Sequence, residues 1–259
     1  MEGMRLDSQL TAEQIEALRR LDSCTVSNTI EAFQVRLRND GFANGASVKC
    51  IFPDLPPIVG YAVTGRIRTS GPPLAGSLPP PAHLSFHHRS DWWDYVLSLP
   101  APRVVIMQDV DRSPGLGALM GDLHVTICQA LGCVAYVTNG AVRDLTTVKD
   151  TGFQFFAGQV SVSHAYAHVH DFGEPIEIGG LRIRPGDLVH GDRHGILTIP
   201  KSIAPDVPAL AARIAEQERR IVEYCKAPGF NVSKLREFVK DADNEISKSV
   251  PQRTDLRGR

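Results

Sequence analysis

Apolar residues recur at helical spacing in several segments of the chain. Ile15, Leu18 and Leu21 follow Thr11 and Gln14, which together have the form of a capping box, so the pattern predicts a helix over roughly 12 to 21. The same reasoning predicts a second helix capped by Ser23 or Thr25, a helix from Asp91 to about Leu99 and a short helix from Leu145 to Lys149. It also predicts two helices near the end of the chain, Val207 to Cys225 and Val232 to Ile246.

Other segments have the apolar alternation and β-branched content of strands. They are 58–69, 103–110, 134–137, 153–157 and 161–171, together with two antiparallel pairs, 175–178 with 181–184 and 187–190 with 196–199. Gly179-Gly180 joins the strands of the first pair, which is typical of a tight hairpin.

One stretch, from Gly121 to Asp144, organises the rest of the chain. An apolar segment of helical length is followed by a break at Gly132-Cys133, a short β-rich run and a predicted turn at Asn139-Gly140. A helix that leads into a strand can bring its two ends together. We therefore expect Asp122 to lie beside Arg143 and Asp144, and this juxtaposition is the candidate site.

The two ends of this stretch carry complementary chemistry. Backbone N–H groups at a helix start lack partners within the helix, so those of Leu123 and His124 can hold a substrate carboxylate. Arg143 offers a fork of donors to an oxyanion, and Asp144 is a hard oxygen ligand of the kind that holds Mg²⁺ together with waters. Asp122 would orient a water or Arg143, or serve as the acid/base. The alternative is structural: Arg143 and Asp144 form a surface pair and Asp122 caps a helix.

Charge and composition restrict the class of partner. The 259 residues contain 28 Lys and Arg against 29 Asp and Glu, a balance that gives no electrostatic reason to expect nucleic acid or an anionic membrane surface. A small-molecule or protein partner is favoured. The N-terminal segment lacks an apolar signal core and no apolar run approaches the length of a membrane span, so a cytoplasmic protein is expected. Five scattered cysteines, none in CxxC spacing, suit a reducing compartment.

Two groups of histidines and one loop leave alternatives open. His83, His87 and His88 match no zinc signature and are expected to be exposed or capping residues. His164, His168 and His170 are predicted on one face of the strand at 161–171, either as metal ligands or, more favoured, as a polar sheet face. The proline-rich segment 71–84 is either an active-site flap or a surface excursion.

The motifs identify a resemblance. The segments LDSCTVSNTI, VGYAVTG, GCVAYVTNGAVRD and PGDLVHGDRHGILTIP, together with the GDL at 121–123, resemble the RraA-like family over roughly residues 21 to 200. This family includes class II 4-hydroxy-4-methyl-2-oxoglutarate/4-carboxy-4-hydroxy-2-oxoadipate aldolases, which also decarboxylate oxaloacetate. Most specific is an acid, twenty intervening residues and then Arg-Asp, here Asp122 and Arg143-Asp144.

The resemblance implies a fold and an assembly. The expected fold is α/β, an RraA-like swivelling β/β/α sandwich with extra N- and C-terminal helices, assembled as a homotrimer or homohexamer. We expect residues 1–200 to form the catalytic domain with its N-terminal helices, 201–250 a C-terminal helical extension, and 251–259 a disordered tail.

The resemblance also assigns roles to individual residues. It makes Asp144 the direct ligand of Mg²⁺ or Mn²⁺ and Arg143 the contact to the keto or enolate oxygen of the substrate. The amides that follow Gly121, those of Leu123 and His124, hold the pyruvyl carboxylate, and Asp122 acts through water. Two departures concern the distal part of the substrate: Asn139 stands where the family usually has Asp, and His124 replaces an apolar residue.

The function implied is that of a divalent-metal-dependent lyase. Its substrate would be a 4-substituted 2-oxo dicarboxylic acid, cleaved at a C–C bond by retro-aldol reaction or decarboxylation through a pyruvate enolate. The alternative is a non-catalytic regulator that binds a ribonuclease or another protein through its surface. Regulatory members of the family need not keep the leading acid, so Asp122 favours an enzyme.

Overall fold

A mixed sheet forms the centre of the protein, whose computed structural model describes residues 9–72 and 91–251. Within those residues nine strands join one sheet in the order β1-β6-β5-β3-β2-β10-β11, with β4 on β5 and β7 on β2, while β8 and β9 form a separate hairpin. The strands are β1 (Lys49–Cys50), β2 (Ile58–Arg68), β3 (Arg103–Asp109), β4 (Ala118–Met120), β5 (Cys133–Val142), β6 (Gln154–Val160), β7 (His168–Phe172), β8 (Ile176–Ile178), β9 (Leu181–Ile183), β10 (Leu188–Asp192) and β11 (Gly195–Ile199). The neighbouring pairs β2-β3, β3-β5 and β5-β6 are parallel. The fold class is therefore α/β, as expected.

The helices are α1 (Ala12–Arg19), α2 (Ser23–Phe33), α3 (Asp91–Ser98), α4 (Asp122–Ala130), α5 (Leu145–Asp150), α6 (Val207–Lys226) and α7 (Val232–Ser249). Side-chain caps satisfy the first N–H groups of α1, α2 and α7, whereas α4, α5 and α6 begin without a side-chain cap. The Thr11 capping box predicted for α1 is confirmed. The cap predicted for α2 is wrong: Asp22 accepts from the Thr25 amide at 2.8 Å, because a carboxylate one residue earlier reaches that donor.

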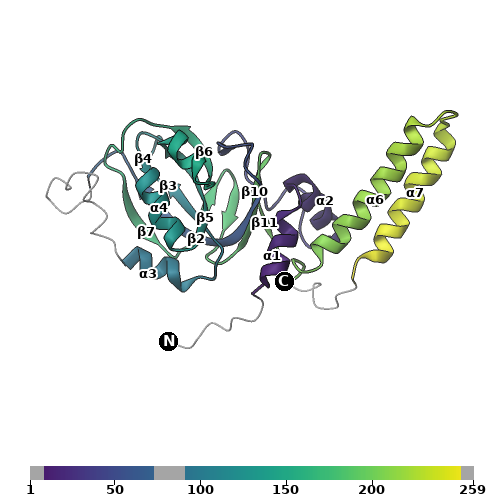
Figure 1. Cartoon of the computed structure of the whole chain (residues 1–259), viewed down its shortest axis with the longest axis horizontal. Helices are drawn as coiled ribbons and strands as arrows, with labels where there is room; N and C mark the ends of the chain where they lie inside the picture. The colour runs from purple at the N-terminus through teal and green to yellow at the C-terminus, as the bar shows by residue number, and fades with distance from the viewer. Residues whose placement is uncertain (1–8, 73–90, 252–259) are drawn as a thin grey trace.

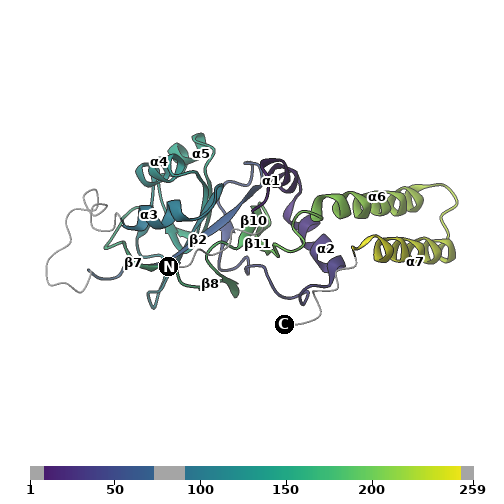
Figure 2. The same ribbon diagram turned by 90° about the horizontal axis from the view of Figure 1, so that it is seen from below.

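Both faces of the central parallel strands are apolar, because helices cover one face and other strands cover the opposite face. Val105 and Met107 of β3 point toward α3, α4 and α5, whereas Val104 and Ile106 pack with the β8-β9 hairpin and β10. Figure 2 shows α3, α4 and α5 on one side of the sheet and β8 on the other. This arrangement places the start of α4 at the edge where β4 and β5 end.

A third apolar cluster joins the N-terminal helices to the start of α6. Val26 and Ile30 of α2 pack with Tyr61, while Ile203 and Leu210 bring in the segment after residue 200. The beginning of the predicted extension 201–250 is therefore part of the core. Beyond it, α6 and α7 form a hairpin that projects away from the sheet (Figure 1). Within α7 only Ala242 is buried.

Two predicted local structures are wrong. The segment 161–171 is not one strand, since β7 begins only at His168 and Ala165 adopts a left-handed φ of 46°. Ser161 and Ser163 accept backbone amides two residues ahead, which turns the chain before β7. Asn139-Gly140 is not a turn either, because both residues lie inside β5, at an irregularity in its pairing with β6.

Two short strands, β1 and β4, escaped the pattern analysis because two or three residues carry no detectable alternation. His83, His87, His88 and all but the first two residues of the 71–84 loop lie outside the described residues. No described helix has both the length and the apolar character needed to cross a membrane.

Candidate active site

The start of α4 and the end of β5 lie side by side because β4 pairs with the last residues of β5. Ala118 is opposite Ala141 and Met120 is opposite Val142 in parallel register. The Arg143 amide then donates to the Met120 carbonyl at 3.2 Å. The chain that leaves β4 toward α4 therefore runs beside the chain that leaves β5.

Asp144 is the residue on which the site converges. Its Oδ2 accepts the backbone N–H of Asp122 at 3.2 Å, and its Oδ1 accepts Nε–H of Arg143 at 3.2 Å. Asp144 stands at the N-cap of α5, yet its side chain makes no cap hydrogen bond to that helix. Its φ is 56°, a left-handed conformation that is uncommon outside glycine. The carboxylate is thus turned away from its local structural partner and toward α4.

Gly121 makes room for this carboxylate. A Cβ built on Gly121 would lie 2.3 Å from Oδ2 of Asp144 and 3.1 Å from Cγ of Arg143. The φ of Gly121 is −141°, which any residue can adopt, so the close approach and not the backbone conformation requires glycine here. We call Gly121, Asp122, Arg143 and Asp144 the Asp144 cradle.

The electrostatics of the cradle favour an ionised carboxylate. Partial burial acts to raise the pKa of Asp144, but the Asp122 amide and the Arg143 guanidinium outweigh it, and the pKa lies below its ordinary value. An ionised carboxylate in a space that a Cβ would fill fits a hard divalent cation, which takes one or two carboxylates and completes its shell with water. Asp144 would be the residue that holds such an ion.

The first two amides of α4 both donate to carboxylates, that of Asp122 to Asp144 and that of Leu123 to Asp122. The Leu123 amide donates to Oδ1 of Asp122 at 2.7 Å, so a substrate carboxylate at this amide would replace the Asp122 carboxylate. Asp122 and Leu123 are both exposed. The helix start can therefore exchange one carboxylate for another without rearrangement of the core.

His124 lies on the side of α4 that faces the turn after β6. Its ring centre is 6.5 Å from that of His164, whose Nδ1–H donates to the Ala118 carbonyl at 2.8 Å. Burial and the nearby His164 lower the pKa of His124 to about 3. His124 is therefore a neutral imidazole at physiological pH and adds no positive charge to the site.

The histidines predicted to share one strand face do not do so. His164 lies in the turn, while His168 and His170 lie in β7, so the prediction for these three residues is wrong. Among residues 9–72 and 91–251 no three His, Cys, Asp or Glu side chains converge as a metal-binding group. A cation held by one carboxylate and several waters needs no such group.

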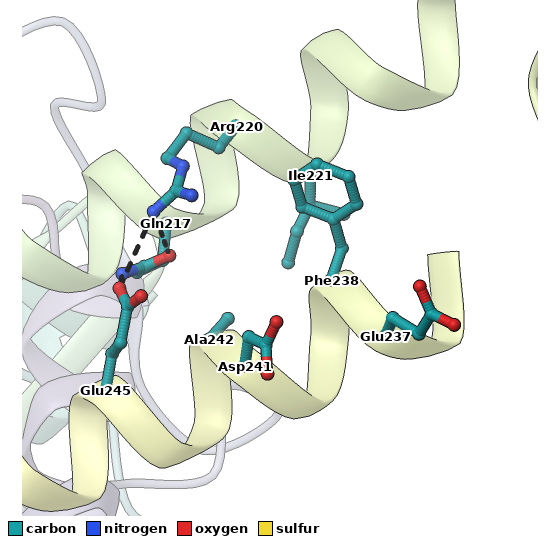
Figure 3. A pocket seen from close by; sticks show the side chains of 8 residues that line it. All are labelled: Gln217, Arg220, Ile221, Glu237, Phe238, Asp241, Ala242 and Glu245. Atoms are coloured by element: carbon teal, nitrogen blue, oxygen red, sulfur yellow. Dashed lines mark hydrogen bonds and ion pairs between the residues drawn. The ribbon is translucent and has the colours of Figure 1, made fainter. Parts of the chain in front are cut away.

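A cavity of about 270 Å³ lies elsewhere, between α6 and α7. Figure 3 shows Arg220 and Gln217 of α6 directed at Glu245 of α7, with Arg220 3.5 Å from that carboxylate. None of the cradle residues lines this cavity. Glu216 of α6 pairs with Arg219 on its own helix at 2.6 Å. The cavity is therefore a feature of the hairpin alone.

The motifs of the cradle fall within a match to a protein family. A family model described as Aldolase/RraA, RraA-like, matches residues 23–198. The chain belongs to the RraA-like family. A relative from Halalkalibacterium halodurans, provisionally named 4-hydroxy-4-methyl-2-oxoglutarate aldolase, is 35% identical over 85 residues, which are 32% of this chain and 40% of the relative. The chain thus matches less than half the length of this relative.

Solved structures share the RraA-like fold. An uncharacterised protein from Pseudomonas syringae pv. tomato superposes with a TM-score of 0.66 at 20% identity, covering 92% of this chain and 99% of that one. RraAS2 of Streptomyces coelicolor, described as an unusual member of the RNase ES inhibitor RraA protein family, gives a TM-score of 0.60 at 20% identity and covers 83% of this chain and 98% of that one. At these identities the comparison establishes the fold.

Proposed function

We propose that the protein is a divalent-metal-dependent lyase that cleaves a C–C bond of a 4-substituted 2-oxo dicarboxylic acid and releases pyruvate. The observation that carries the proposal is the Asp144 carboxylate, held at the start of α4 by the Asp122 amide and by Arg143. A structural ion pair would not require the left-handed backbone of Asp144 or the missing side chain at Gly121.

The residues of the cradle divide the work of the reaction. The amides at the start of α4 would bind the carboxylate next to the 2-oxo group. Arg143 would face the 2-oxo oxygen, where negative charge accumulates as the C3–C4 bond breaks and its electrons form the enolate. Asp122 is exposed and can leave the Leu123 amide, so it would exchange protons through water with the departing group and with C3.

Mg²⁺ or Mn²⁺, bound by Asp144, would supply Lewis-acid chemistry at the 2-oxo group. The same enolate serves retro-aldol cleavage and oxaloacetate decarboxylation, so one site accounts for both. We further propose that the active assembly is a homotrimer or homohexamer and that the protein works in the cytoplasm.

A coupled assay for pyruvate tests the proposal. The purified chain is given oxaloacetate, 4-hydroxy-4-methyl-2-oxoglutarate and 4-carboxy-4-hydroxy-2-oxoadipate with Mg²⁺, and the assay is repeated with EDTA and after Mg²⁺ is restored. We expect turnover of at least one substrate that EDTA abolishes and Mg²⁺ recovers. Turnover that survives EDTA would refute the metal dependence, and no turnover of any substrate would refute the lyase.

One observation favours a second candidate, a non-catalytic regulator that binds a ribonuclease or another protein. The Ser161 hydroxyl donates to the Leu116 carbonyl at 3.1 Å, which brings the chain at Leu116 next to the segment that carries Val160 and Val162. Leu116, Val160 and Val162 are 58%, 55% and 95% exposed. Such apolar exposure is typical of protein contact surfaces. Absence of lyase activity together with capture of a ribonuclease would favour this function.

A further inference from the structure

We propose that Asn139 is a positioning residue whose side-chain amide sets the bend in β5 and thereby places Arg143 and Asp144 opposite α4. The amide spans both main-chain groups of one residue in the next strand. Asn139 Oδ1 accepts the Asp109 N–H at 2.7 Å, and Asn139 Nδ2 donates to the Asp109 carbonyl at 2.9 Å. The Asn139 side chain thus makes the two hydrogen bonds to Asp109 that the backbone of β5 would make if its pairing with β3 continued.

The register of the sheet changes at this residue. Pairing of β3 with β5 ends at Met107 opposite Thr138. Along β5, Thr138 to Ala141 is a step of three residues, while the paired step on β6, Ala157 to Gln159, is two, so β5 contains one extra residue. Beyond this bulge β5 pairs with β4 instead of β3. Asn139 is therefore the point at which β5 passes from one neighbour to the other.

The surroundings of the bulge are closely packed. A Cβ on Gly140 would lie 3.0 Å from Oδ2 of Asp109, and one on Gly158 would lie 2.4 Å from the Asn139 carbonyl oxygen. Asp109 is buried, with only 2% of its surface exposed, and its carboxylate accepts hydrogen bonds from the amides of Gly115 at 2.8 Å and Asp111 at 3.1 Å. The side chain of Asp109 thus binds the loop after β3, while the main chain of Asp109 is bound by Asn139.

The position of the catalytic residues follows from the bulge. Side chains point to alternate faces of the sheet along a strand. If the bulge were lost, the register of β5 would shift by one residue, and Arg143 and Asp144 would each point to the opposite face of the sheet. Without the Asn139 amide, the Asp109 N–H and carbonyl become available to the backbone of β5, and the bulge loses its main hydrogen bonds. We expect the end of β5 to shift and the Asp144 carboxylate to leave the Asp122 amide.

This inference rests on the proposed function for its activity test, and the structural test is independent of that function. The variants are N139A, which removes the amide, and T29A, which removes a different, partly buried hydrogen bond, that from the Thr29 hydroxyl to the Thr25 carbonyl on α2 at 2.8 Å. Helix α2 packs on α6, β10 and β11. We expect kcat for pyruvate release to fall at least about tenfold in N139A. T29A should keep the wild-type kcat even though its melting temperature falls by a similar amount to that of N139A.

A crystal structure of N139A supplies the second readout. The predicted result is an Asp144 carboxylate beyond hydrogen-bond distance of the Asp122 amide. An unchanged cradle would overturn the inference, as would an N139A kcat equal to that of wild type. If wild type releases no pyruvate, the proposed function fails and the crystal structure alone decides the inference. If N139A does not fold, N139V, which removes both amide contacts to Asp109 and supplies a β-branched side chain suited to a strand, carries the same comparisons.

Discussion

The Asp144 carboxylate accepts the backbone N–H of Asp122, a residue 22 positions earlier in the chain, at 3.2 Å. This contact joins the start of a helix to the residue after a strand, and Arg143 completes it from the neighbouring position. The arrangement combines an anion-binding helix start with an ionised hard ligand. That combination is what the chemistry of a 2-oxo acid requires.

Replacement of Gly121 by alanine should disable the site with little effect on the fold. The added methyl group would lie 2.3 Å from Oδ2 of Asp144, while the backbone conformation suits alanine. The carboxylate must therefore move, and we expect a loss of roughly 100-fold in kcat/KM for pyruvate release. Gly45 has no neighbouring atom within 4 Å of such a methyl group, so G45A is the matched control. Equal activity of the two variants would contradict the cradle.

The substitution H124L separates the backbone of residue 124 from its side chain. The proposed contact to the substrate carboxylate is the amide, which leucine retains, and the imidazole is uncharged at neutral pH. We expect kcat/KM to stay within about threefold of the wild-type value, since the amide alone binds the carboxylate. A loss of two orders of magnitude in the same assay would show that the imidazole itself takes part.

The buried imidazole of His190 should make the protein less stable in mild acid. Its Nδ1 lies 3.0 Å from the Ser23 hydroxyl and its Nε2 lies 3.0 Å from the Leu21 carbonyl. Burial lowers the pKa of His190, so the unfolded chain binds a proton more readily than the folded chain. The contribution of the neutral ring is complete above pH 6.5 and declines as the pH falls below that value, by up to about 1.4 kcal/mol per pH unit.

Urea denaturation between pH 7 and pH 5 measures this effect. The free energy of unfolding of the wild type should fall with pH more steeply than that of H190Q, in which the residue cannot titrate. Parallel pH profiles for the two proteins would show that His190 does not contribute to the acid sensitivity.

The beginning of α6 should contribute more to stability than the hairpin beyond it. Leu210 is 3% exposed in the cluster formed with α1 and α2, whereas Val239 on α7 is 40% exposed. We expect L210A to lower the free energy of unfolding by about 2–5 kcal/mol. V239A should change it by less than about 0.5 kcal/mol, as is usual for surface positions. Equal losses in chemical denaturation would show that α7 contributes to the core as much as the beginning of α6 does.

The sequence predicted the elements whose signals are local. The capping box at Thr11 begins α1, and Gly179-Gly180 closes the β8-β9 hairpin. The proximity of Asp122 to Asp144 was also predictable, because an α4-β5 unit returns the chain to the same edge of the sheet.

What the sequence could not reveal depends on contacts between distant segments. Asn139-Gly140 has the composition of a turn, yet β5 continues through it because the Asn139 side chain pairs with Asp109 of another strand. The requirement for glycine at 121 arises from a side chain 23 residues later. The proximity of the candidate site residues could therefore be predicted from the sequence, whereas the contacts that position them required the fold.

The central claim is that Asp144 supports metal-dependent cleavage. Its most direct test is the rate of pyruvate release with saturating Mg²⁺ by wild type and by D144A, both verified as folded by circular dichroism. We expect a wild-type rate that EDTA abolishes and a D144A rate lower by at least about 100-fold, because the carboxylate that would hold the ion is gone. A D144A rate equal to that of wild type would contradict the central claim.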